Sequence, residues 1–140
     1  MKVRHAMTTP AITISPEESV SVASRTLAHY NIGMLPVCAA DGTLRGVITD
    51  RDIVTRCLAG DRDPKSTPLA EIMTSQTCTA DPNMDAGAAA HLMGSRQIRS
   101  LPVVEAGKLC GLLSLGDLAT REETAYDAAD ALTDITSNIR

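Results

Sequence analysis

Residues 32–53 read IGMLPVCAADGTLRGVITDRDI, and residues 98–118 read IRSLPVVEAGKLCGLLSLGDL. Both stretches carry Leu-Pro-Val, then a turn containing Gly, then Gly, two apolar residues, a hydroxyl residue and, three positions later, Asp. They align at a shift of 66 residues before the turn and 65 after it, because the second stretch has one residue fewer there. The chain therefore contains two copies of one unit, and an internal repeat of this kind organises a fold.

The repetition extends outward from these two stretches. Met7-Thr8 aligns with Met73-Thr74, and Pro16 aligns with Pro82. Between the copies, the polar segment GDRDPKST is typical of a linker. We assign the segments as a first copy, a linker, a second copy and a C-terminal amphipathic helix, at residues 1–60, 61–67, 68–120 and 121–140.

Apolar periodicity and turn residues predict the order β-α-β-β-α in each copy. The first copy is expected to contain a strand at 11–14, a helix capped by Ser19, a hairpin of 34–38 with 44–48, and a helix from Thr49 or Asp50 to Leu58. The second is expected to contain a strand at 77–80, a helix capped by Asp85, a hairpin of 100–104 with 109–113, and a helix from Ser114. A copy of about 55 ordered residues is marginal alone. We therefore expect an α+β fold with α/β-type packing: two repeats about a pseudo-two-fold axis, plus a C-terminal helix.

The C-terminal segment carries an apolar stripe at helical spacing. Its members are Ala125, Ala128, Leu132, Ile135 and Ile139. Such a stripe serves equally to cover the core of its own chain or to contact a second copy in a dimer. The sequence leaves both alternatives open.

Composition excludes several classes of function. The 140 residues carry 13 Lys and Arg against 17 Asp and Glu, a net charge of -4, with no Trp or Phe. A general nucleic-acid binder needs a basic face or stacking aromatics, so no nucleic-acid partner is expected. No apolar run suits a membrane helix or a signal peptide, which predicts a cytoplasmic protein with no membrane partner. Isolated His residues, scattered Cys residues and the lack of a phosphate-binding loop predict no metal site, no catalytic cofactor and no enzyme activity.

The repeated motif with candidate chemistry ends each hairpin. Thr49 and Asp52 stand three residues apart where a strand meets a helix, as do Ser114 and Asp117. A hydroxyl beside free helix N–H groups suits a phosphate, and a carboxylate one turn later can accept hydrogen bonds from a cis-diol such as ribose. The same spacing is also a plain capping box that needs no ligand. Duplication reduces the preference for the plain cap and does not remove it.

These residues resemble the cystathionine β-synthase (CBS) domain. The resemblance rests on the stretches 32–53 and 98–118 and on the leading Ala6-Met7-Thr8 and Ile72-Met73-Thr74, and it covers about residues 5–120. It implies a tandem CBS module that binds an adenosine-containing ligand: AMP, ADP, ATP, S-adenosylmethionine or, in some members, NAD.

The resemblance also implies roles for individual residues. Thr49 and Ser114 would meet phosphate or the 5′ side of the ligand, and Asp52 and Asp117 would hold ribose. The two loops that would flank adenine contain Ile32, Met34 and Pro36 in the first copy and Ile98, Ser100 and Pro102 in the second. Backbone groups near Thr13 and Thr79 would read the base edge. Arg51 and Arg99, each present in only one copy, are candidate phosphate partners because of the planar guanidinium.

Three classes of function follow. The leading one is a regulatory adenosyl-ligand sensor without catalytic activity, a homodimer that signals through the angle between repeats and through oligomer contacts to a downstream protein not named by the sequence. The alternative is a structural or protein-interaction module with no small-molecule ligand. The third is a thiol-based redox sensor using Cys38 or Cys110; against it, free Cys residues usually serve as small buried hydrophobes.

Overall fold

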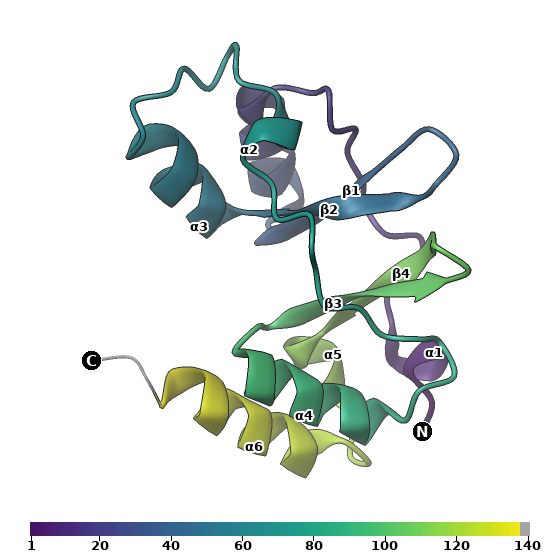
Figure 1. Ribbon diagram of the computed structural model, residues 1–140. Coiled ribbons are helices and arrows are strands. Elements are labelled where there is room, and N and C mark those ends of the chain that lie inside the picture. The colour runs from purple at the N-terminus through teal and green to yellow at the C-terminus, as the bar shows by residue number, and fades with distance from the viewer. Residues whose placement is uncertain (138–140) are drawn as a thin grey trace. The chain divides into compact units, whose positions relative to one another are not determined.

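The chain folds into two compact units that cut across the two sequence copies. The computed structural model describes residues 1–137 (Figure 1). Unit 1 combines Met1–Ala11 with the chain from Cys78 onward, and unit 2 is Ile12–Thr77. Each unit therefore contains the main body of one copy and the leading segment of the other.

Unit 2 is built from the main body of the first copy. Its elements are α2 (Val20–Tyr30), β1 (Met34–Cys38), β2 (Leu44–Thr49), α3 (Asp50–Asp52), the π-helix η1 (Ile53–Leu58) and the 3-10 helix η2 (Leu69–Glu71). The predicted cap of α2 is confirmed, because Ser19 Oγ accepts a hydrogen bond from the Val22 N–H at 3.2 Å. Asn31 ends this helix in the left-handed conformation, with φ 53°.

The hairpin of unit 2 is flanked on both edges by short segments. β1 and β2 are antiparallel, with Leu35 opposite Ile48. Ile14 bridges Val37 in parallel on one edge, and Thr74 bridges Val47 antiparallel on the other. Of the strand predicted at 11–14, only Ile14 pairs.

Unit 1 repeats this plan with the second copy. Its elements are α1 (Val3–Ala6), α4 (Ala86–Arg96), β3 (Ser100–Glu105), β4 (Lys108–Ser114), α5 (Leu115–Ala119) and α6 (Ala125–Thr136). Asp85 caps α4 as predicted, through its Oδ2 and the Ala88 N–H at 3.0 Å. Ala80 bridges Val103 in parallel and Thr8 bridges Leu112 antiparallel, so the strand predicted at 77–80 is also reduced to one paired residue.

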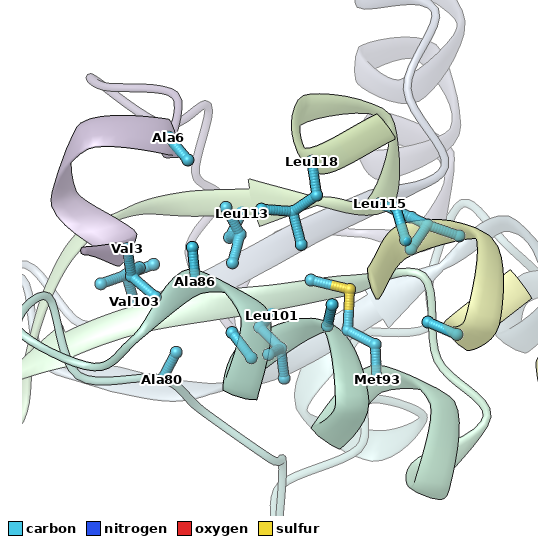
Figure 2. Packing of buried hydrophobic residues seen from close by; sticks show 14 of the residues in the cluster. Val3, Ala6, Ala80, Ala86, Met93, Leu101, Val103, Leu113, Leu115 and Leu118 are labelled. Atoms are coloured by element: carbon cyan, nitrogen blue, oxygen red, sulfur yellow. The ribbon is translucent and has the colours of Figure 1, made fainter. Parts of the chain in front are cut away.

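Each unit has its own hydrophobic core. In unit 2, the helix α2 and the hairpin bury Val20, Leu35 and Ile48 completely. In unit 1, side chains of α1 join those of α4 and of the β3–β4 hairpin, as Figure 2 shows for Val3 and Ala6 beside the cluster. The leading segment of each copy is thus part of the core of the other copy's unit.

Helix α6 lies alongside α4 within unit 1 (Figure 1). Ala128, Ala131 and Ile135 are buried, so the apolar face of α6 covers its own chain. The predicted stripe was wrong in one position: Leu132 is 43% exposed, and the fully buried Ala131 faces α4 instead. The physical reason is close helix approach at Gly94, where only a small partner fits. Ile139 lies outside the described residues.

Candidate functional site

The Thr49–Asp52 motif lies where β2 passes into α3. Thr49 Oγ1 accepts a hydrogen bond from the Asp52 N–H at 3.1 Å, and Asp52 Oδ2 accepts one from the Thr49 N–H at 3.0 Å. The two side chains thus form a reciprocal capping box. Both are partly buried, and the Asp52 side chain keeps 14% of its surface exposed. We call this motif, with the loop 32–36, the Thr49 site.

The Ser114–Asp117 motif has the same geometry at the start of α5. Ser114 Oγ accepts from the Asp117 N–H at 3.0 Å, and Asp117 Oδ2 accepts from the Ser114 N–H at 2.9 Å. This motif and the loop 98–102 form the Ser114 site. The capping interpretation of both motifs is therefore confirmed, and each carboxylate still has acceptor capacity, because an ionised Asp offers about four lone-pair positions.

A backbone hydrogen bond ties the preceding loop to each motif. The Asp50 N–H donates to the Gly33 carbonyl at 3.1 Å, and the Leu115 N–H donates to the Arg99 carbonyl at 2.8 Å. In the hairpin registers, Met34 lies opposite Thr49 and Ser100 lies opposite Ser114. Within each unit the fold therefore brings the apolar loop beside the hydroxyl-carboxylate motif.

The edge residues complete each site. The Ile14 N–H donates to the Pro36 carbonyl at 3.1 Å, and the Ala80 N–H donates to the Pro102 carbonyl at 2.9 Å. Pro36 and Pro102 are buried, whereas Ile32, Met34, Ile98 and Ser100 are half-buried. The remaining predicted site residues have exposed side chains: Thr13, Thr79, Arg51 and Arg99.

One residue of the Thr49 site was missed by the sequence analysis. Arg56 Nη2 lies 3.4 Å from Asp52 Oδ1, and its Nη1 donates to the Ile72 carbonyl at 3.0 Å and to Thr74 Oγ1 at 2.9 Å. The signal was present, because Asp and Arg stand four residues apart at 52 and 56 and again at 117 and 121. Residues at this spacing are neighbours on a helix surface.

Two other kinds of feature are absent from residues 1–137. No three His, Cys, Asp or Glu side chains in this range gather into a group that would hold a metal ion. None of the helices in the same range has both the length and the apolar character needed to cross a membrane.

The fold and the two motifs define a class: a tandem α+β repeat in which each copy presents a capped hydroxyl-carboxylate pair beside an apolar loop. The sequence profile of the CBS domain matches residues 3–59 and 69–124. The chain belongs to the CBS domain family, and CBS pairs are regulatory modules.

Known proteins are similar over nearly the whole chain. The CBS domain-containing protein YhcV of Bacillus subtilis is 39% identical over 133 residues, covering 95% of this chain and 94% of YhcV. The CBS domain pair of protein MJ0100, solved with 5-methylthioadenosine and S-adenosyl-L-methionine, has a TM-score of 0.77 at 28% identity, covering 85% of this chain and 93% of that one. The CBS domain protein PAE2072 from Pyrobaculum aerophilum, solved with AMP, has a TM-score of 0.81 at 24% identity, covering 92% and 98%; this likeness concerns the fold.

Proposed function

We propose that this protein is a regulatory module that binds an adenosine-containing ligand, either an adenine nucleotide or S-adenosylmethionine. The observation that carries the proposal is the duplicated site geometry. In each unit a half-buried carboxylate is fixed by one backbone N–H and lies beside an apolar loop. An acceptor pair next to an apolar surface is what a ribose diol joined to a flat base requires. The ligands in the solved MJ0100 pair support the same class of ligand.

The proposal assigns a role to each part of the site. Asp52 and Asp117 accept hydrogen bonds from the ribose hydroxyls, and Thr49 and Ser114 meet the 5′ side. The half-buried loop side chains contact the base: Ile32, Met34, Ile98 and Ser100, next to Pro36 and Pro102. Backbone groups beside Thr13 and Thr79 read the base edge. Arg51 and Arg99 are exposed and long enough to approach a phosphate.

The output is proposed to pass through a homodimer to a downstream protein. Val54 and Leu58 are 57% and 52% exposed, one turn apart on η1. Exposed apolar side chains at this spacing fit a protein contact. The same observation favours the alternative function, a protein-interaction module in which the capping boxes bind no ligand.

Thermal unfolding against a ligand panel separates these two functions. The panel contains AMP, ADP, ATP, S-adenosylmethionine, NAD and 2′-deoxy-ATP, followed with an extrinsic dye because the chain has no Trp and only two Tyr. At a ligand concentration of about 100 Kd, linkage stabilises the folded state by about 2.7 kcal/mol and raises Tm by several degrees. We expect this shift with a ribose ligand and a clearly smaller one with its deoxy counterpart.

Matched variants locate the site. Asp52→Asn and Asp117→Asn keep an oxygen that can accept the capping hydrogen bond and remove the charge, so the fold is retained. We expect the double variant to lose the ligand-induced shift while its own Tm falls by only a few degrees. No shift with any ligand, in parent protein shown to be free of bound nucleotide, would contradict the sensor and favour the interaction module.

A further inference from the structure

We propose that Arg56 is a positioning residue of the Thr49 site, and that it couples occupancy of Asp52 to the segment Ile72–Thr74. The inference rests on the function proposed above and adds a regulatory element to one of its two sites. It concerns contacts within unit 2 alone, because Asp52, Arg56 and the segment all belong to that unit.

The contacts of Arg56 form a continuous chain. One guanidinium nitrogen faces Asp52 Oδ1 at 3.4 Å, and the other donates to the Ile72 carbonyl and to the Thr74 hydroxyl. The backbone of Thr74 in turn pairs with Val47 of β2, two residues before Thr49. A single side chain thus joins the proposed diol acceptor to the segment that precedes the passage of the chain into unit 1 at Cys78.

The Arg56 contact completes the orientation of the Asp52 carboxylate. Thr49 N–H occupies one position on Oδ2, and Arg56 lies against Oδ1. Of about four acceptor positions, one on each oxygen remains, which matches the two hydroxyls of a ribose. A carboxylate held from both sides loses less freedom when the diol binds, which favours affinity.

The Ser114 site lacks this link. Arg121 occupies the position equivalent to Arg56 at the shift of 65 residues. Among residues 1–137, the Nε of Arg121 is buried without a hydrogen-bond partner, and the Arg121 side chain forms no ion pair with Asp117. The carboxylate of Asp117 is therefore fixed only by the Ser114 N–H. The two sites are accordingly unequal. In the Thr49 site the carboxylate is held from both sides and linked through Arg56 to Ile72–Thr74, whereas in the Ser114 site the carboxylate is held by one N–H and has no such link.

The test measures binding of AMP and of 2′-deoxy-AMP by calorimetry in an Asp117→Asn background, so that the Thr49 site reports alone. We expect Arg56→Gln to weaken AMP binding by about three- to tenfold, because the carboxylate loses its orientation. Binding of 2′-deoxy-AMP should change clearly less, so that discrimination between the two ligands falls. Arg121→Gln is the matched control and should change neither affinity.

A second readout addresses the coupling. In the same background, AMP should slow amide hydrogen exchange at Met73 and Thr74, and Arg56→Gln should abolish this protection even at saturating AMP. Arg56→Lys keeps the charge and the aliphatic stem without the planar fork, so this variant should bind AMP with intermediate affinity. An intermediate affinity shows that the effect of Arg56→Gln comes from the lost contacts and not from misfolding.

The outcomes are distinguishable. If AMP binds and Arg56→Gln behaves as Arg121→Gln does, or if both ligands weaken equally, the role of Arg56 is refuted and the proposed function stands. If AMP and the other adenosyl ligands fail to bind the parent protein, the proposed function falls and the inference falls with it.

Discussion

Helices α4 and α2 are equivalent in the two repeats, and they differ in what covers them. In unit 1, α6 packs on α4, and a methyl group added at Gly94 would lie 3.1 Å from the Ala131 Cα and 2.9 Å from Asp134 Oδ2. In unit 2, the equivalent residue of α2 is Ala28, which is exposed. The start of α2 is met by the linker, whose Pro64 carbonyl accepts from the Ser21 N–H at 2.9 Å. Within residues 1–137, α6 thus covers α4 at the position where α2 leaves Ala28 exposed, and the smaller residue Gly94 allows this close approach.

Gly94→Leu and Ala28→Leu form a matched pair with the largest expected contrast. Leu at position 94 would collide with α6, and overpacking of this kind costs about 3 kcal/mol at the upper end of its usual range. Leu at position 28 stays on an exposed helix surface and should change the free energy of unfolding by no more than about 0.5 kcal/mol. Chemical denaturation measures both values. Equal effects of the two variants would show that α6 is not seated on α4 in solution.

The exchanged leading segments offer a second comparison, at two equivalent glycines. A Cβ at Gly46 would lie 2.4 Å from the Thr74 carbonyl oxygen, and a Cβ at Gly111 would lie 2.8 Å from the Thr8 carbonyl oxygen. Because glycine has no side chain, the leading segment of the other copy can lie close against the edge of the hairpin in both units.

Ala substitution at these glycines sharpens the comparison between units. We expect Gly46→Ala to destabilise the protein by about 2 kcal/mol and Gly111→Ala by about 1 kcal/mol, because the first clash is closer and both involve backbone. Hydrogen exchange should locate the loosened amides at Thr74 in the first variant and at Thr8 in the second. Unchanged exchange at these amides would argue that each leading segment packs elsewhere in solution.

The exchange of leading segments lay beyond what the sequence could predict. Met7-Thr8 and Met73-Thr74 are recognisable as equivalent, and each is chemically suited to the edge of either hairpin. Because the copies are alike, local periodicity does not distinguish pairing within a copy from pairing with the other. Pairing of Thr8 with Leu112 is a contact across more than a hundred residues, which only the tertiary structure reveals.

The candidate sites were more accessible to sequence reasoning than the packing around them. The motif spacing predicted both capping boxes, because hydrogen bonds between residues three apart are local. Arg56 was overlooked, since two of its partners, Ile72 and Thr74, are distant in sequence. Ala131 was overlooked for a related reason. Only a small side chain fits on α6 where α4 approaches closely, whereas hydrophobicity alone favours Leu132.

The smallest expected effect concerns the alkylation rates of Cys38 in the first repeat and Cys110 in the second, and it tests the redox alternative at Cys38. Burial raises the pKa of the Cys38 thiol on β1, whereas Cys110 on β4 is only half-buried. Since the thiolate is the reactive form, we expect iodoacetamide at pH 8 to modify Cys110 at least about tenfold faster than Cys38, measured by peptide mass spectrometry. Between pH 7.5 and pH 8.5 the rate at Cys38 should rise in proportion to the hydroxide concentration, because its raised pKa keeps the thiol largely protonated throughout this range. In urea the two rates should converge, which attributes the difference to the fold. Rapid modification of Cys38 in the native protein would contradict its burial and support a thiol-based sensor at that residue.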